Sequence, residues 1–339
     1  MKSRTLLQLI SFCIVFIPTT LIAQDPGFDP YGGRLDLPVA EGSGYFRLGE
    51  IHGKHFLVTP DGNAFRAIGI NHTHMNQSTE YDTLIADLKS KGFNSGDYQG
   101  PLWMWNRIPY SKGIQLLQTS TWLPESQFRF EDVFDPAFLI TLETKIKNIV
   151  QPQAGNANLI CYFFTDVPVW EIEKYGSGWI DFYKSLDANS PGGKEWSSWK
   201  TAHSDSPEKD FIRLIARQLY REASGMIRKY DTNHLIFSDR YIEYHFPESV
   251  VYEALPYVDG IAIQPKNHLS FEFLEGIYKK YKRPIFIADH VTSYATDEYP
   301  NTMGQVADNV EDYLEFYKSS VYDAMSQPYI VGYNKCQYM

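Results

Sequence analysis

The sequence predicts an α/β fold of the (β/α)8 TIM barrel class, with a doubly wound parallel sheet as the alternative. Buried apolar runs alternate with amphipathic helical segments along most of the 339 residues. Two of the runs end on an aspartate, Asp166 in NLICYFFTDVPVW and Asp289 in RPIFIADH. Because a parallel barrel places its chemistry where the strands end, this pair indicates an active site.

The first 23 residues are typical of a secretory signal peptide. Lys2 and Arg4 precede an apolar stretch that ends in small residues near Ala23. We therefore expect a secreted protein, periplasmic or extracellular. No other run is long and apolar enough to span a bilayer. The formal net charge of -10 argues against nucleic acid as the main partner.

The rest of the chain divides into two expected parts. Residues 24–62 form a leader and a β-hairpin, with turns near Gly53 and at Pro60-Asp61-Gly62. Residues 63–339 form the barrel, with an aromatic-rich insertion at 167–206. The expected strands are 65–71, 92–98, 113–121, 158–166, 234–239, 260–265, 284–289 and 328–336. The expected helices are 78–91, one from Pro136 capped by Asp135, 207–230 and 303–325.

The end of the expected barrel is unusual, because no helix follows the eighth strand. Either another segment covers that strand or an apolar face meets water. Cys161 and Cys336 lie in the fourth and eighth strands, too far apart across a barrel for a disulfide. We expect both to be inert core thiols.

Polar or aromatic residues end nearly every expected strand, which favours a polar ligand site at one rim. The expected substrate-binding residues are Asn71, His72, His74, Trp122, Trp170, Asp239, Arg240, Gln264, Lys266, His290, Lys335 and Gln337. Successive strand residues point to opposite sides, so only one member of Asp239/Arg240 and of Asp289/His290 faces the barrel axis. The cations among them fit a sulfate or uronate on the substrate, or else pair with neighbouring aspartates.

Several segments resemble those of agarase-like glycoside hydrolases. GYFRLGEIHGKHFLVTPDGNAFRAIGINHTH is similar to the family's opening segment, where a hairpin leads through a Pro-Asp-Gly turn into the first strand. NLICYFFTDVPVW, HLIFSDRY, PIFIADH and YIVGYNKCQY are similar to its fourth, fifth, seventh and eighth strands. The resemblance runs from about Gly44 to Met339 and implies a retaining glycosidase.

The resemblance also implies a glutamate acid/base after strand four and a glutamate nucleophile after strand seven. This chain departs from both, since Val167 stands at the first position and Asp289 ends strand seven. The tryptophan expected on strand eight is replaced near Lys335. The usual catalytic pair is therefore absent from the positions that the resemblance assigns to it.

Three interpretations follow from these departures. In the first, Asp166 is the general acid, desolvated by Pro168 and Trp170, and Asp289 is the nucleophile or base. Retention and inversion both stay open, because they depend on the gap between the two carboxylates. In the second, the barrel has lost catalysis and kept sugar binding. In the third, the acid is one of Asp239, Glu171 and Glu173.

A rival prediction comes from His72 and His74, an H-x-H pair of the kind that binds metal in some barrel hydrolases. Such a site needs further ligands at other strand ends. Those strands end on Asp166, Asp239, Gln264 and Gln337. We therefore expect no metal and no other cofactor, and hydrogen-bonding roles for both histidines.

The sequence as a whole predicts a glycoside hydrolase acting on a galactan-type oligosaccharide or polysaccharide, such as agar, carrageenan or porphyran. Asp166 and Asp289 are its expected catalytic residues, and a carbohydrate is its expected partner. The alternative from another class is a catalytically inactive carbohydrate-binding barrel. The tryptophans of the 167–206 insertion fit either sugar stacking or a miniature core, and the oligomeric state stays open.

Overall fold

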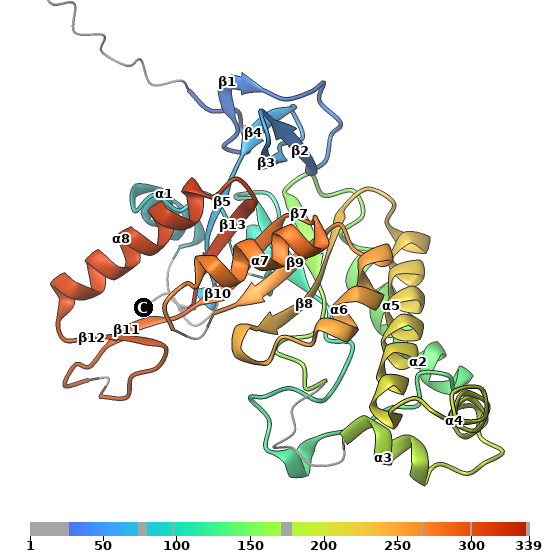
Figure 1. Cartoon of the computed structure of the whole chain (residues 1–339). Coiled ribbons are helices and arrows are strands. Elements are labelled where there is room, and N and C mark those ends of the chain that lie inside the picture. Colours follow the sequence, from blue (N-terminus) through green and yellow to red (C-terminus); the bar gives the residue numbers. More distant parts are fainter. Residues whose placement is uncertain are drawn as a thin grey trace, which may run out of the picture.

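A computed structural model describes residues 27–73, 80–96, 98–170, 178–265, 267–298 and 300–336. The fold is mixed α/β, with a parallel seven-stranded sheet surrounded by helices (Figure 1). Its strands follow the order β5-β13-β10-β9-β8-β7-β6. They are β5 (Ala67–Ile70), β6 (Tyr110–Gly113), β7 (Leu159–Phe163), β8 (Leu235–Ile242), β9 (Gly260–Gln264), β10 (Ile285–His290) and β13 (Ile330–Lys335).

The sheet is nearly closed into a barrel. Between its edge strands β5 and β6, Ser95 forms a single parallel bridge with Gly69, and Gly96 forms another with Tyr110. The expected second strand is thus reduced to these two bridges. The expected third strand, 113–121, is wrong, because the strand lies earlier, at β6, and the chain beyond Gly113 forms only isolated bridges.

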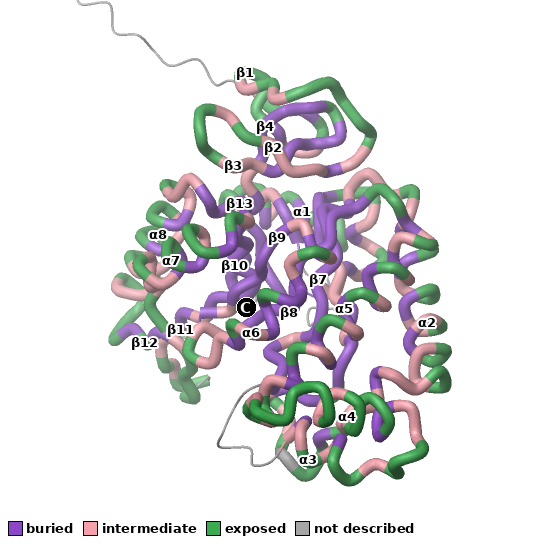
Figure 2. Tube along the Cα trace, turned by 45° about the vertical axis from the view of Figure 1, so that its right-hand side comes forward, coloured by how far each residue is buried: buried purple, intermediate pink, exposed green. Residues whose placement is uncertain are grey.

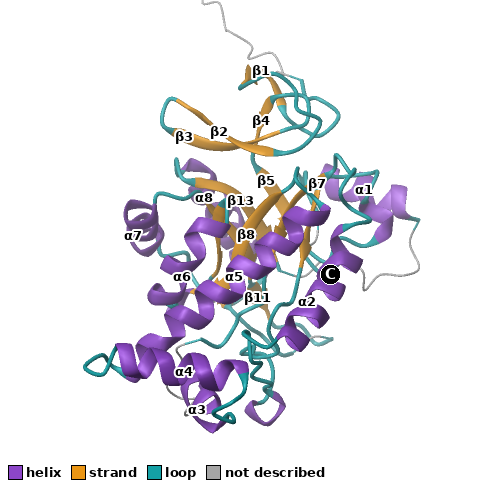
Figure 3. Cartoon of the chain, turned by 90° about the vertical axis from the view of Figure 1, so that its right-hand side faces the viewer, coloured by secondary structure: helices purple, strands orange, loops and turns teal. Residues whose placement is uncertain are grey.

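The helices lie outside the sheet (Figure 3). Helix α2 begins as the sequence predicts, because the Asp135 side chain accepts a hydrogen bond from Ala137 N and Pro136 occupies the first turn. In α5 the buried residues recur at helical spacing. The helices are α1 (Tyr81–Ser90), α2 (Pro136–Val150), α3 (Gly178–Ser185), α4 (Pro191–Ala202), α5 (Phe211–Tyr230), α6 (Glu248–Ala254), α7 (Phe271–Tyr281) and α8 (Val310–Ser326).

The predicted N-terminal hairpin is part of a four-stranded antiparallel sheet of order β1-β4-β3-β2. It turns at His52 and Gly53, which both have positive φ, as a tight hairpin turn requires. Its strands are β1 (Arg34–Pro38), β2 (Arg47–Ile51), β3 (Lys54–Val58) and β4 (Asn63–Phe65). A small parallel pair, β11 (Thr292–Tyr294) and β12 (Gln305–Ala307), follows β10.

The N-terminal sheet covers the amino end of the barrel (Figure 1). His55 N donates to Pro328 O, just before β13, at 2.7 Å. Phe46, Leu57 and Phe65 join Phe163 and Phe237 in one buried cluster, which fills the barrel interior. The small sheet therefore closes one end of the barrel, and its opposite end carries the strand ends predicted to be functional.

A second, larger core lies between the sheet and the helices. Figure 2 shows the strands as the most buried part of the chain, with the exposed residues on the surrounding helices and loops. All six residues of β13 are buried, and Tyr333 packs against Tyr317 of α8 at 6.4 Å between ring centroids. Of the two alternatives for the eighth strand, the structure supports the first, in which another segment covers it.

The tryptophans in the described part of the 167–206 insertion form a miniature core. Trp179 is buried and stacks on Trp170, with ring centroids 5.4 Å apart. Trp196 and Trp199 stack on each other and pack edge-on against Phe211 of α5. Structural packing therefore accounts for these rings. None of the helices in the described residues has the length and apolar character needed to cross a membrane.

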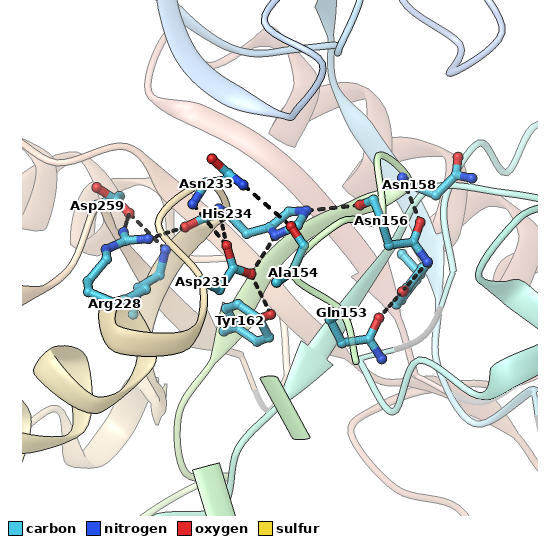
Figure 4. Close-up of polar contacts among 12 residues, drawn as sticks. Gln153, Ala154, Asn156, Asn158, Tyr162, Arg228, Asp231, Asn233, His234 and Asp259 are labelled. Carbon is cyan, nitrogen blue, oxygen red and sulfur yellow. Dashed lines mark hydrogen bonds and ion pairs between the residues drawn. The ribbon is translucent and has the colours of Figure 1, made fainter. Parts of the chain in front are cut away.

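Several buried polar residues form a hydrogen-bonded cluster at the amino end of the barrel (Figure 4). Asp231 Oδ2 lies 2.6 Å from His234 Nδ1 and accepts a hydrogen bond from Tyr162 OH at 2.7 Å. His234 Nε2 lies 2.9 Å from Asn156 O. We call Tyr162, Asp231, His234 and Asn156 the amino-end network; the side chains of Asp231 and His234 are fully buried.

Candidate active site

Polar side chains from most of the barrel strands meet at the opposite, carboxyl end. Each contacts or interacts electrostatically with another member of the group, so the group is continuous. We call this group the rim cluster. Its members are Asn71, His72, Tyr98, Asp166, Arg240, Gln264, Asp289 and Cys336.

Asp289 lies at the centre of the rim cluster and is 4% exposed. Asn71 Nδ2 donates to its Oδ1 at 2.7 Å, and Gln264 Nε2 donates to its Oδ2 at 3.3 Å. Burial raises the pKa of Asp289, while Arg240 and the Asn71 hydrogen bond oppose that shift. The carboxyl group is therefore fixed in orientation by two neutral amides and removed from most of the solvent.

Asp166 has different surroundings. Its Oδ1 lies 2.9 Å from Arg240 Nη2, and its side chain is 23% exposed. The guanidinium carbon of Arg240 lies 3.5 Å from the ring centroid of Tyr98, which is within cation-π range. Burial raises the pKa of Tyr98 to about 12, so the ring partner stays a neutral phenol at physiological pH. Asp166 is thus held in a charged pair at the rim.

Two irregularities in the sheet decide which neighbouring residues enter the rim cluster. Between Phe237 and Arg240, β8 advances three residues while β9 advances two, and β10 does the same against β13 between Ile287 and His290. A β-bulge of this kind breaks the alternation of side chains. Asp289 consequently faces Asn71, and Arg240 faces Asp166.

The partners that the bulges displace contact the helix side of the sheet. Asp239 accepts hydrogen bonds from Tyr220 of α5 and from Trp170 Nε1, and burial raises its pKa to about 6. His290 contacts Tyr333 OH and Asn267 O, and burial lowers its pKa to about 4. Asp239, Trp170 and His290, which were expected to line the substrate site, therefore have their hydrogen bonds outside the rim cluster.

The position of the Trp170 side chain bears on the surroundings of Asp166. Trp170 was expected to desolvate that carboxyl group. It is 4% exposed and lies in the larger core between the sheet and the helices, where it stacks on Trp179 and donates a hydrogen bond to Asp239. Its ring packs against both Trp179 and Tyr220. Trp170 therefore has its contacts with Trp179, Tyr220 and Asp239, and its desolvation of Asp166 stays a prediction.

The remaining predicted site residues have varied positions. Trp122 is 60% exposed. Lys335 Nζ lies over the Tyr313 ring of α8 and donates a hydrogen bond to Cys336 O. Its ammonium group therefore already has partners within the protein. Several predicted residues lie outside the described residues, namely His74, Lys266, Gln337, Glu171 and Glu173.

Val167, which stands where the resemblance places an acid, has an unusual backbone. Its φ is 37°, in the left-handed region that β-branched residues rarely adopt, and it is 5% exposed. Its amide donates to Arg240 O at 3.1 Å, and its carbonyl accepts from Thr121 N at 3.0 Å. The loop after β7 therefore holds a strained backbone beside Asp166, a feature common near functional sites.

Two members of the rim cluster, Tyr98 and Cys336, lie at expected strand ends but were not predicted to be site residues. Tyr98 ends the expected second strand, which forms only single bridges, and it was not among the expected substrate-binding residues. Cys336 was expected to be an inert core thiol, but it is partly exposed and hydrogen-bonds Asp289, which together with burial raises the pKa of its thiol. Cys161 is buried in the barrel interior and neither cysteine forms a disulfide, as predicted.

A cavity of about 620 Å³ lies away from the rim cluster. It is lined by Leu116, by the first turns of α2 and by Phe130 and Phe182. Its lining also includes Asp132 and Asp135, but neither predicted catalytic aspartate. The cavity is therefore a separate feature of the surface, beside the insertion.

Comparison with known proteins supports the resemblance seen in the sequence. No protein-family model matches the chain. Beta-agarase B from Vibrio sp. (strain JT0107) is 33% identical over 86 residues, which are 24% of this chain and 9% of the agarase. That match is local, so the likeness over the whole chain comes from solved structures.

An exo-beta-agarase aligns with a TM-score of 0.78 and 15% identity, covering 93% of this chain and 62% of its own. Another agarase aligns with a TM-score of 0.73 and 17% identity, covering 92% and 59%. A beta-galacturonidase from Eisenbergiella tayi gives 0.51 and 14%, covering 87% and 46%. The agarase-like resemblance is confirmed, and this chain spans about three fifths of those agarase structures.

Proposed function

We propose that the chain hydrolyses glycosidic bonds of an agar-type galactan at the rim cluster. The observation that carries this proposal is the presence of two carboxyl groups, Asp166 and Asp289, at the carboxyl end of a barrel with an agarase-like fold. Glycoside cleavage needs two such groups, one to transfer a proton and one to act at the sugar carbon. Secretion, predicted from residues 1–23, fits a polysaccharide substrate outside the cell.

In this proposal Asp289 is the group that acts at the anomeric carbon, as nucleophile or base. Asn71 and Gln264 fix its orientation, and a fixed carboxylate beside the reacting carbon lowers the entropic part of the barrier. Asn71 is held in turn, because it donates to Ala288 O at 2.9 Å and accepts from Asn334 at 3.2 Å. The residues that orient Asp289 are therefore themselves held by further hydrogen bonds.

Asp166 is the proposed proton-transfer group. Its Oδ1 is engaged by Arg240 at 2.9 Å, whereas a general acid must be free to meet the leaving oxygen of the substrate. A sugar that displaces Arg240 from Asp166 on binding would remove this obstacle. The same ion pair favours the second candidate function, a barrel that binds sugar without cleaving it, because Val167 also replaces the acid of related enzymes.

The decisive experiment is a screen of red-algal galactans and aryl glycosides with the wild-type chain and the Asp166→Asn and Asp289→Asn variants. Product anomers are followed by NMR, which also reports retention or inversion. We expect turnover of an agar-type substrate and a loss of roughly 10² to 10⁴-fold in each variant, the range for acid-base groups. Asp36→Asn, which removes an exposed carboxylate of the N-terminal sheet, is the control.

The outcomes separate the two functions. Activity that survives both rim substitutions refutes a role for these carboxyl groups. Binding of galactan oligosaccharides by calorimetry, without turnover by the wild-type chain, supports the non-catalytic barrel instead.

A further inference from the structure

We propose that the rim cluster contains an inhibitory binding site for zinc, formed by His72, Asp289 and Cys336. The inhibition rests on the proposed hydrolytic function, but the binding does not. Each of the three residues offers one ligand atom, and these atoms all lie within 4.8 Å of one another. They come from the ends of three adjacent strands, β5, β10 and β13.

The spacing is close to that of a zinc site. Zinc holds nitrogen, sulfur and oxygen ligands at roughly 2.0 to 2.3 Å, so neighbouring ligand atoms of a tetrahedral site lie about 3.3 to 3.8 Å apart. The observed limit of 4.8 Å requires the donors to draw together by about 1 Å. His72 and Cys336 are both only partly buried at the strand ends, so their side chains have room to make that adjustment.

The donor types select the ion. A thiolate and an imidazole favour zinc or another soft to borderline metal, while magnesium and calcium require oxygen ligands. Three protein ligands leave a fourth position for water, as in open zinc sites. The H-x-H pair read from the sequence thus supplies His72 to a ligand set whose other members lie far away in the chain.

Neighbouring residues already position the donors. Asn71 fixes the Asp289 carboxylate, and Cys336 N donates to His290 O at 2.8 Å, which ties the thiol-bearing residue to β10. The His72 ring packs edge-on against Tyr98, with centroids 5.7 Å apart. Supporting contacts of this kind orient metal ligands and raise their affinity.

Charge balance permits the ion despite the nearby Arg240. Zinc bound by a carboxylate, a thiolate and a neutral imidazole forms a complex without net charge. Arg240 is already paired with Asp166, at 2.9 Å. The bound ion therefore adds little repulsion, and it occupies the carboxyl group on which the proposed hydrolysis depends.

Cobalt(II) tests the site directly, because a cobalt-thiolate bond gives a charge-transfer absorption band that needs no substrate. The full chain is titrated with cobalt(II) and then with zinc in competition. Cys336→Ser removes the thiolate, and Cys161→Ser is the matched control, since Cys161 lies in the barrel interior away from the three donors. Thermal unfolding shows that each variant is folded.

We expect the band in the wild-type chain and in Cys161→Ser, its displacement by zinc, and its absence in Cys336→Ser. Zinc affinity should fall at least about tenfold in Cys336→Ser. Loss of a residue that only supports a metal ligand already lowers affinity by about tenfold or more, and Cys336 is a proposed ligand itself. No band in the wild-type chain, or an equal band in Cys336→Ser, overturns the proposal.

The effect on hydrolysis is a separate readout. Zinc should inhibit galactan turnover by the wild-type chain, a chelator should restore it, and Cys336→Ala should be less sensitive. If the chain binds cobalt through Cys336 but cleaves no galactan, the metal site stands and the proposed hydrolysis fails. If it cleaves galactan without metal binding or zinc inhibition, the reverse holds.

Discussion

The amino-end network and the rim cluster, at opposite ends of the barrel, differ in how completely their buried polar atoms are hydrogen-bonded. In the amino-end network the side-chain groups of Tyr162, Asp231 and His234 all have hydrogen-bond partners. At the carboxyl end, within the described residues, Arg240 Nε and Nη1 and Gln264 Oε1 are buried without a hydrogen-bond acceptor or donor. The amino-end network therefore has its hydrogen bonds complete, and the rim cluster retains polar groups that a ligand can engage.

The difference separates residues that stabilise the fold from residues that serve function. An unpaired buried polar group costs free energy, so a protein keeps it where binding or catalysis needs it. The strained Val167 lies at the same end as the unpaired groups. Substitutions at the amino end should therefore reduce stability, and substitutions at the rim cluster should reduce function more than stability.

The largest change in stability is expected for Asp231→Ala. It leaves the buried His234 and Tyr162 without their shared acceptor, and breaking a buried pair costs about 3 to 5 kcal/mol. Urea unfolding followed by circular dichroism measures this change. Asp135→Ala, at the exposed N-cap of α2, is the control and should cost only about 1 kcal/mol. Equal losses in the two variants would break the comparison.

The amino-end network also predicts a loss of stability in acid. Burial alone would raise the pKa of Asp231, but hydrogen bonds from His234 and Tyr162 outweigh it and hold the pKa below its ordinary value. A lowered folded-state pKa stabilises the fold above the unfolded value of about 3.9, and this contribution is lost as the pH falls through the folded value.

Urea midpoints measured from pH 6 down to pH 3 test this expectation. The wild-type chain should lose more stability over the acid part of that range than Asp231→Asn, which has no carboxylate to protonate at this position. Parallel pH profiles for the two chains would show that Asp231 contributes nothing to acid sensitivity.

A smaller effect concerns Val167 and its neighbour Val169. Both valines are buried, at 5% and 4% exposure, but only Val167 has positive φ. Val169→Gly should cost more than Val167→Gly, by about 1 to 2 kcal/mol, because glycine relieves left-handed strain only at position 167. Thermal unfolding of the two variants gives the difference directly. Equal costs would mean that the backbone at 167 is not strained.

The smallest change in stability is expected for Arg240→Met. Its partner Asp166 is 23% exposed and can be hydrated, and methionine keeps an apolar contact with Tyr98. We expect a loss of about 1 kcal/mol, as for an ion pair whose carboxylate reaches solvent, well below that of Asp231→Ala. Galactan binding measured by calorimetry should weaken more clearly. A loss of stability as large as that of Asp231→Ala would show that the rim ion pair is structural.

Sequence patterns predicted most of the scaffold, because apolar runs and caps act locally. The N-cap at Asp135, the strands from β7 onwards and the hairpin turn at Gly53 were all marked by their own residues. The early strands were harder to place, since the segment near Ser95 forms single bridges and β6 has only four residues.

The site was less predictable because two β-bulges set its geometry. Sequence reasoning recognised that one member of each pair, Asp239/Arg240 and Asp289/His290, faces inward, but the choice depends on the extra residue in β8 and β10. The same holds for Cys336, whose contact with Asp289 joins two strands far apart in the chain. Long-range register of this kind leaves no local signal.

The most direct test of the account is a crystal structure of the Asp289→Asn variant with an agar-type oligosaccharide. We expect a sugar ring at the rim cluster, against the side chains at positions 166, 264 and 289. An oligosaccharide bound only in the cavity lined by Leu116, α2 and Phe182 would contradict it.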